Sequence, residues 1–298
     1  MQVQSLPDRP FLVQRRSFVN MDAHTCSDAE DYEILVDIGE GAYGKVYKAR
    51  ETKGQQRLVA LKKLNIPNDL ESGIPAFMIR EVALLRKMEY FNHPNIVKLL
   101  NVSAILRNRT LDLTLVFEYI DQDLSTFLAS APSTGLSREK IKDVMRQLLH
   151  GLDFLHTNML VHRDLKPDNV LVSSRGEVKI ADFGLSRIYT YHIALTPCVV
   201  TLWYRAPEVL LHSGYMPSVD IWSAGCIFAE LFLLREEDWP VESPISYSSN
   251  WGTCARSAQL LPNLSQQEND LLSQCLTFNP TKRISASRAL AHSFLAGP

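Results

Sequence analysis

The chain has 298 residues, of which 46% are hydrophobic and 21% are charged, and its formal net charge is −2. This size and composition are those of a globular protein with one large domain or two lobes. The nearly balanced charge excludes the strong basic field that draws proteins to nucleic acids or anionic membranes.

Cysteine usage and hydropathy indicate where the protein works. The five cysteines include no C-x-x-C pair, so we expect reduced thiols and a location in the nucleus and cytoplasm. The most hydrophobic run, residues 221–234, contains Glu230 and is too short to span a bilayer. No signal-peptide pattern opens the chain. We therefore expect no membrane and no nucleic acid among its partners.

Residues 1–31 carry no hydrophobic periodicity. We expect a disordered leader in this segment, because its mixed composition offers no face that a core can bury. Met1 and Met21 are alternative starting residues, and the sequence does not choose between them.

A glycine-rich turn follows the first predicted strand, residues 32–39. Residues 39–46 read Gly-Glu-Gly-Ala-Tyr-Gly-Lys-Val, and a strand pattern continues to residue 49. Dinucleotide-binding folds also carry glycine triplets, but there the triplet opens a helix. A glycine hairpin between two strands lets the backbone lie close over phosphate groups, which an ordinary turn does not require.

The next predicted strand contains residues 59–62, Val-Ala-Leu-Lys. Its spacing after the glycine turn favours a role for Lys62 in pairing with α- and β-phosphates. Because side chains alternate along a strand, Lys63 points to the opposite face, and we expect it to be solvated.

A helix is predicted from Pro75 to about residue 90. Hydrophobic residues recur on one face at helical spacing, namely Met78, Val82, Leu85 and Met88. Glu81 lies beside that stripe, where Lys62 is its candidate partner because an unpaired acid next to a core is costly. Phe77 and Ile79 add hydrophobic surface away from the stripe, which favours a protein partner over simple burial against the sheet.

Residues 111–120 form a strongly hydrophobic predicted strand at the junction of two lobes. Backbone groups of Glu118 to Ile120 can hydrogen-bond a flat base at such a junction. Asp123, which follows shortly after, can hold a ribose hydroxyl.

A long helix is predicted after Ser137, which is a favourable N-cap residue. Its hydrophobic face consists of Ile141, Met145, Leu148, Leu152 and Leu155. His150 and His156 lie on the same helix, and we expect them to be satisfied surface or core histidines rather than ligands.

The most informative polar stretch is residues 162–169, His-Arg-Asp-Leu-Lys-Pro-Asp-Asn. Asp164 can accept a proton from an attacking hydroxyl group. Lys166 can neutralise charge on a transferring phosphoryl group. Two solvated acids in polar loops are the alternative, but they would not require this spacing.

Asn169 and Asp182 offer oxygen ligands suited to Mg²⁺. The residues between them predict two short strands, 170–172 and 178–180, joined by a turn at 173–176. A hairpin of this kind brings Asn169 and Asp182 together.

The segment from residue 184 to 206 has no regular pattern, and such a long loop inside a domain is usually functional. Thr196 lies in this loop as a candidate phosphorylation site. Arg80, Arg163 and Arg187 can together hold a phosphate on Thr196 through charge-assisted hydrogen bonds.

The last third of the chain predicts a helix over 220–234 that is hydrophobic almost all round and an amphipathic helix over 265–277. Arg283 is a candidate partner of Glu208 in an internal ion pair.

Taken together, these motifs resemble the cyclin-dependent protein kinases, over residues 31 to 295. The catalytic stretch and Asp-Phe-Gly at 182–184 match the H-R-D-x-x-x-x-N and D-F-G motifs of protein kinases. Residues 73–81, Gly-Ile-Pro-Ala-Phe-Met-Ile-Arg-Glu, resemble the partner-binding helix of the cyclin-dependent group, and residues 199–208 resemble its proline-directed activation segment. Within this group, the sequence most closely resembles the branch activated by D-type cyclins, at residues 80–86, 116–118, 121–124, 194–197 and 276–280.

The resemblance implies an α+β, two-lobed protein kinase fold. The small lobe (32–119) would hold five strands and one main helix, and the large lobe (120–295) would be mostly helical. With ATP and Mg²⁺ as cofactors, the enzyme would phosphorylate Ser or Thr before Pro, including retinoblastoma-type protein substrates, in control of the G1 phase. A D-type cyclin and cyclin-dependent kinase inhibitors would be its partners.

The resemblance also assigns residues to the reaction. The catalytic group would be Asp164, Lys166, Lys62 and Glu81, with Asn169 and Asp182 on the metal. The nucleotide pocket would include Ile38, Gly39, Glu40, Gly41, Ala42, Tyr43, Gly44, Lys45, Val46, Ala60, Lys62, Glu118, Ile120, Asp123 and Leu171. Tyr43 matches an inhibitory phosphorylation site, and Val199, Val200 and Arg205 would shape the pocket for the substrate proline.

Three departures from the family pattern stand out. The partner-helix signature reads Pro-Ala-Phe-Met-Ile at residues 75–79, and Asp168 replaces the usual glutamine. Near 234–238 the chain lacks the helix and flanking loops that relatives place there, an apparent deletion that would shorten the large lobe. An inactive isoform that binds a cyclin or an inhibitor is therefore the alternative to an active kinase.

Overall fold

The computed structural model of the chain describes residues 31–41, 44–64, 82–84, 86, 92–107, 110–132, 135–183, 187–188, 203–211, 216–232 and 264–297. The predicted leader, except for Asp31, and the apparent deletion near 234–238 lie outside these residues. In the part of the chain that is described, no helix is long and hydrophobic enough to cross a membrane.

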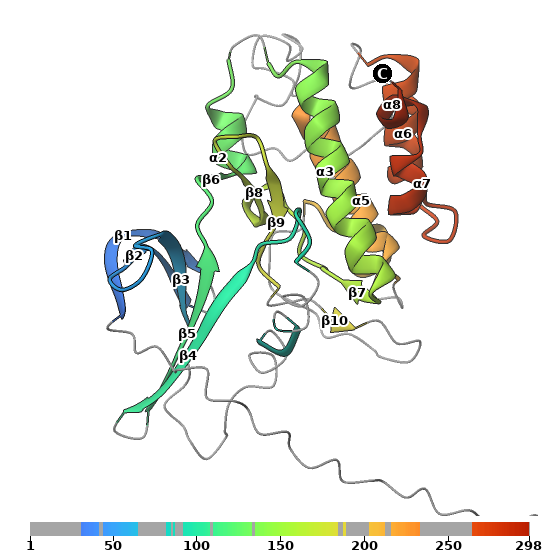
Figure 1. Cartoon of the computed structure of the whole chain (residues 1–298). Coiled ribbons are helices and arrows are strands. Elements are labelled where there is room, and N and C mark those ends of the chain that lie inside the picture. Colours follow the sequence, from blue (N-terminus) through green and yellow to red (C-terminus); the bar gives the residue numbers. More distant parts are fainter. Residues whose placement is uncertain are drawn as a thin grey trace, which may run out of the picture.

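The small lobe is an antiparallel sheet of five strands. They are β1 (Tyr32–Gly41), β2 (Gly44–Glu51), β3 (Leu58–Leu64), β4 (Leu99–Arg107) and β5 (Thr110–Glu118). The strand order is β1-β2-β3-β5-β4, and β4 and β5 form a long hairpin that leads toward the other lobe (Figure 1). Of the helix predicted over 75–90, residues 82–84 and 86 are described, and they are helical.

Side chains alternate along β3 as the sequence predicts. Val59 and Leu61 are buried and pack with Ala49 and Val116 on one face of the sheet. Lys62 therefore points to the other face, opposite Val46 of β2 and Leu115 of β5. Lys63 is exposed, as predicted, and its ammonium lies 5.5 Å from the centre of the Tyr47 ring.

The large lobe is mostly helical. Its helices are α2 (Leu124–Ala129), α3 (Arg138–Thr157), α4 (Pro207–Leu210), α5 (Ser218–Leu231), α6 (Gln266–Cys275), α7 (Ala286–Leu290) and α8 (Ser293–Ala296). Short strands and one 3₁₀ turn lie between them, namely β6 (Gln122–Asp123), β7 (Leu160–Val161), η3 (Pro167–Asn169), β8 (Val170–Val172), β9 (Val178–Ile180) and β10 (Arg187–Ile188). α3 and α5 run side by side, with α6 to α8 beside them (Figure 1).

The α3 helix forms as its sequence predicts. The Ser137 side chain accepts the backbone N–H of Lys140 at 3.2 Å and caps the first turn. The whole predicted hydrophobic face is buried, with additional residues beside it, in a core that extends through α5, α6 and the β8–β9 hairpin. The two-lobed α+β architecture is therefore confirmed.

The α5 helix is buried on nearly all sides because its residues are small or hydrophobic. It runs from Ser218 to Leu231, so it begins two residues earlier and ends three residues earlier than predicted. Gly225 lets α6 approach closely, since a Cβ atom there would lie 2.8 Å from the Cβ of Cys275.

The close contact at Gly225 predicts that Gly225→Ala destabilises the protein by about 1–3 kcal/mol, because the added methyl overpacks the α5–α6 contact. Urea unfolding measures this difference. Gly39→Ala is the control, because a Cβ at Gly39 meets nothing within 4 Å. A Gly225→Ala variant as stable as the wild type would contradict the packing described here.

Candidate active site

The buried carboxylate of Asp220, near the start of α5, holds the loop that follows β7. It accepts the backbone N–H groups of His162 and Arg163, each at 2.9 Å. His156 Nε2 lies 2.9 Å from the same carboxylate. Burial alone would raise the pKa of Asp220, but these bonds and the His156 charge hold that pKa below its ordinary value.

Sequence reasoning did not find this role of Asp220. An acid that opens an otherwise hydrophobic buried helix was the available signal, because such a charge must find partners. The expectation that His156 is a satisfied core histidine is confirmed by its bond to Asp220.

His162 connects this loop to the segment that carries Asp182. Its Nδ1 accepts the Asp164 N–H at 3.3 Å, and its Nε2 lies 2.9 Å from the Ala181 carbonyl oxygen. Together these contacts assign the proton to Nε2, which then donates to Ala181. The ring also meets Phe183 edge-on, with 5.3 Å between ring centres.

Asp164 lies at the centre of the site. The Asn169 amide nitrogen donates to the Asp164 backbone carbonyl at 2.7 Å and to its carboxylate at 3.2 Å. The Lys166 ammonium is 3.8 Å from the same carboxylate. Burial raises the pKa of the Asp164 carboxyl, while the charge of Lys166 opposes that rise. An acid in these surroundings is suited to accept a proton.

The predicted hairpin brings Asn169 beside the segment that carries Asp182. Val170 pairs with Ile180 across β8 and β9, and the Ala181 N–H donates to the Asn169 carbonyl at 2.9 Å. From the small lobe, the Lys62 ammonium reaches Asp182 Oδ1 at 3.0 Å. The three predicted residues thus meet where the two lobes face each other.

The backbone at this site adopts an uncommon conformation. Asp182 has φ of 59° and Arg163 has φ of 76°, in the left-handed region that side chains other than glycine rarely adopt. Such conformations persist where surrounding contacts determine them, and they cluster at functional sites.

The donor set fits a magnesium ion. Both contacts of the Asn169 side chain use its nitrogen, which leaves the amide oxygen as a ligand. The Asp182 side chain is 45% exposed, so its carboxylate is accessible. Among the described residues no three His, Cys, Asp or Glu side chains form a metal cage. Few protein ligands are characteristic of Mg²⁺ that is shared with phosphate groups.

Residues of the predicted nucleotide pocket come from both lobes. Ile38 lies on β1 and Ala60 on β3, on the same face of that strand as Lys62. Glu118 ends β5, Ile120 follows it, and Leu171 on β8 pairs with Asp123 on β6. The Asp123 carboxylate caps α2 by accepting the Thr126 N–H at 2.8 Å, while the predicted ribose contact stays a prediction.

The glycine turn joins β1 and β2. Gly41 pairs with Gly44, and Gly39 pairs with Val46. A Cβ at Gly44 would lie 2.0 Å from the Lys63 carbonyl oxygen, and its φ is +153°, so this position requires glycine. Lys45 and Glu40 form an exposed ion pair at 3.3 Å, and Glu40 raises the Lys45 pKa.

Several predicted site residues lie outside the described part of the chain: Ala42, Tyr43, Arg80, Glu81, Thr196, Val199 and Val200. Arg187 begins β10 and pairs with Val161, two positions before Arg163. The backbone thereby brings two of the three predicted arginines close, and their phosphate pocket stays a prediction. The predicted Arg283–Glu208 ion pair is confirmed, with Nη1 of Arg283 2.6 Å from Oε1 of Glu208.

Comparison with known proteins assigns a family to this arrangement. The family model described as "Protein kinase domain" matches residues 32–295. Cyclin-dependent kinase 4 of Mus musculus is 51% identical over 294 residues, which cover 90% of this chain and 97% of the relative. The protein of the same name from Rattus norvegicus is 52% identical over 291 residues, covering 89% and 96%. That from Xenopus laevis is 50% identical over 290 residues, covering 89% and 90%.

The Asp220 network predicts that Asp220→Ala lowers the free energy of unfolding by about 3–5 kcal/mol at neutral pH, since it leaves His156 and two N–H groups unpaired. Because the folded-state pKa of Asp220 is lowered, the contribution of the carboxylate is present above the unfolded value, about 3.9. It is lost as the pH falls through the folded pKa. Urea unfolding at several pH values measures both effects.

Asp270→Ala is the matched control. Asp270 also contacts a histidine, His292, at 2.9 Å, but its side chain is 59% exposed. We expect a much smaller loss of stability there, because solvent screens the pair. Equal losses in the two variants would contradict the importance of the buried network.

Proposed function

The chain belongs to the protein kinase family, among its cyclin-dependent serine/threonine kinases, and on this premise we propose that it phosphorylates serine or threonine residues that precede proline. The γ-phosphate comes from ATP, with Mg²⁺ as cofactor. One observation carries the proposal. The Lys62 ammonium lies 3.0 Å from the Asp182 carboxylate, and this ion pair lies beside the loop in which the Asn169 amide nitrogen lies 3.2 Å from the Asp164 carboxylate.

In the proposed reaction, Asp164 accepts the proton of the substrate hydroxyl as the hydroxyl oxygen attacks the γ-phosphorus. The bond between the γ-phosphorus and the β–γ bridging oxygen breaks, and ADP is the leaving group. Its burial and its bond from Asn169 support this role, because they fix the carboxylate in one orientation. Lys166, 3.8 Å from that carboxylate, balances the negative charge that develops on the transferring group.

The nucleotide phosphates would lie under the glycine turn. The cationic Lys62 supports this placement, because its ammonium group favours an anion. Asn169 and Asp182 would hold Mg²⁺, which when bound would neutralise negative charge on the phosphate groups.

The relatives are named cyclin-dependent kinases, and we extend that dependence to this chain. We propose a D-type cyclin as activator, cyclin-dependent kinase inhibitors as regulators and retinoblastoma-type proteins as substrates, in control of G1 in the nucleus and cytoplasm. Thr196 is the proposed activating phosphosite, with Arg80, Arg163 and Arg187 as its pocket. Glu81 is the proposed partner of Lys62 when the cyclin is bound.

A second candidate function draws on the shortened sequence near 234–238, which would leave part of the large lobe uncovered. In that case the chain would bind a cyclin or an inhibitor with little or no turnover. Large hydrophobic side chains exposed in this lobe favour that candidate: Trp203, Leu210, Leu211 and Phe278. Cyclin binding without phosphate transfer would distinguish it from the active kinase.

The role of Asp164 predicts that Asp164→Asn lowers kcat by about 10²- to 10⁴-fold, because the amide cannot accept the hydroxyl proton. The assay measures phosphate transfer from ATP-Mg to a Ser-Pro peptide with a D-type cyclin present, and cyclin binding should be unchanged. Asp168→Asn on the same loop is the control, since Asp168 is exposed and should be dispensable. Transfer that persists in Asp164→Asn would remove this residue from its proposed role.

The surroundings of Asp164 also predict a pH effect. A protonated carboxyl cannot act as a base, so activity falls as the pH drops through the Asp164 pKa. Lys166 lowers that pKa, and therefore Lys166→Met should move the acidic limb of kcat/KM to higher pH. Lys142→Met, which removes a bond to the Gly297 carbonyl, should leave the limb in place. A limb that stays or moves to lower pH in Lys166→Met would refute this assignment.

A further inference from the structure

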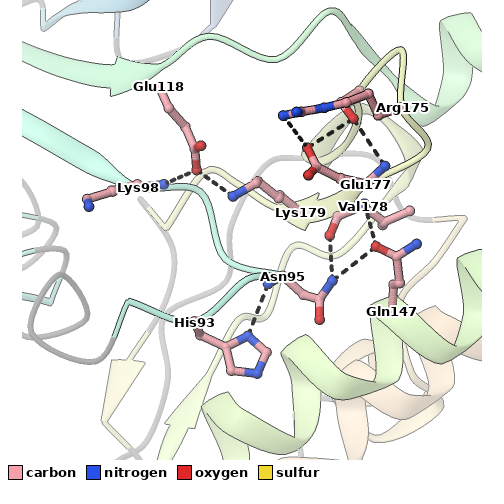
Figure 2. Close-up of polar contacts among 10 residues, drawn as sticks. His93, Asn95, Lys98, Glu118, Gln147, Arg175, Glu177, Val178 and Lys179 are labelled. Atoms are coloured by element: carbon pink, nitrogen blue, oxygen red, sulfur yellow. Dashed lines mark hydrogen bonds and ion pairs between the residues drawn. The ribbon is translucent and has the colours of Figure 1, made fainter.

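The carboxylate of Glu118 joins three segments where the two lobes meet (Figure 2). Its Oε1 accepts the Lys98 backbone N–H at 2.8 Å and the Lys179 ammonium at 2.9 Å. The side chains of Lys179 and Glu118 are only 14% and 26% exposed. The ion pair is therefore largely shielded from water, and each charge depends on the other.

This contact changes the hydrogen bonding between Lys98 and Glu118 at the end of β5. The Glu118 N–H donates to the Lys98 carbonyl at 3.0 Å, as in an ordinary antiparallel pair. The reciprocal bond differs, because the Lys98 N–H donates to the Glu118 carboxylate. The Glu118 carboxylate thus accepts the Lys98 N–H, which in a regular antiparallel pair would donate to the Glu118 carbonyl oxygen. The Lys98 N–H is therefore directed to the carboxylate and not to the Glu118 carbonyl oxygen.

The same contact reaches the strand that leads to Asp182. Lys179 is the central residue of β9, three positions before Asp182. Residues 95–97 run beside β9, since the Val97 N–H donates to the Ile180 carbonyl and the Ile180 N–H donates to the Asn95 carbonyl, each at 2.9 Å.

Side chains reinforce this pairing. The Asn95 amide nitrogen donates to the Val178 carbonyl at 2.9 Å and to Gln147 of α3 at 3.2 Å (Figure 2). The Val178 N–H donates to the same Gln147 oxygen at 2.8 Å. β9 is therefore fixed from both sides.

We propose that Glu118 and Lys179 are positioning residues for the nucleotide base. Their ion pair keeps the Lys98 N–H away from the Glu118 carbonyl and fixes the base-binding backbone relative to the strand that carries Asp182. The proposal rests on the proposed function, because it takes residues 118–120 as the contact for the adenine of ATP.

If Glu118 and Lys179 affected ATP binding only through their charges, the two variants would behave differently from each other. ATP is an anion, so the loss of the Lys179 charge would weaken binding, whereas the loss of the Glu118 charge would strengthen it. Positioning predicts that both losses weaken binding. It also predicts the same weakening for adenosine, which carries no phosphate.

The test is isothermal titration of ADP-Mg and of adenosine into the full chain. Glu118→Ala and Lys179→Met should each weaken both ligands by about three- to tenfold, the size expected for one hydrogen bond to the base. In kinetics, KM for ATP should rise more than kcat falls. Lys179→Arg keeps the charge and should bind almost as the wild type does.

Glu118→Gln serves if Glu118→Ala does not fold, since its amide oxygen still accepts the Lys98 N–H, and it should give a smaller loss. Glu51→Ala removes another ion pair of the small sheet, with Arg57 at 2.8 Å, and should leave both affinities unchanged. Tighter ADP binding in either Glu118 variant would overturn the proposal. Unchanged adenosine affinity with a lowered melting temperature would also overturn it, because that is the result of a merely structural role. A wild-type chain that binds neither ligand would instead refute the proposed function.

Discussion

The active site depends on one buried carboxylate. Asp220 lies at the start of the most buried helix and accepts two consecutive backbone N–H groups, those of His162 and Arg163. A buried charge must be compensated, and here the compensation comes from the loop that carries Asp164. The cost of burying the acid is thus coupled to the conformation of the loop, including the left-handed backbone at Arg163.

The second requirement is that the two lobes present their groups to one point. β9 meets this requirement, because it leads directly to Asp182 of the large lobe and its Lys179 contacts Glu118 at the end of β5 in the small lobe. Lys62 then reaches Asp182 from the middle of the small sheet. The geometry of the proposed nucleotide site therefore follows from contacts made by one short strand.

Local patterns in the sequence were sufficient to predict much of this arrangement. Alternation along β3 placed Lys62 on the correct face, and the turn at 173–176 predicted the hairpin that brings Asn169 beside Ala181. Ser137 was recognised as a cap because capping is a local interaction.

The Arg283–Glu208 ion pair was predicted although it spans 75 positions, but two other contacts between distant segments were not. The bond from the Arg163 backbone to Asp220 spans 57 positions and that from Lys179 to Glu118 spans 61, and no periodicity or motif spacing encodes such partners. Glu118 was predicted to act through its backbone, whereas its carboxylate proves to determine which backbone groups are available. Glu81 and Thr196 themselves lie outside the described residues, so their assignments stay predictions.

The central claim is that Lys62, Asp164, Asn169 and Asp182 surround a single nucleotide–metal cluster. The most direct measurement is the affinity of ADP with and without Mg²⁺, for the wild-type chain and for Asp182→Asn. The account predicts that Mg²⁺ tightens ADP binding in the wild type and has little effect in the variant. Binding that ignores Mg²⁺ in the wild type, or that keeps its full Mg²⁺ dependence in Asp182→Asn, would contradict the account.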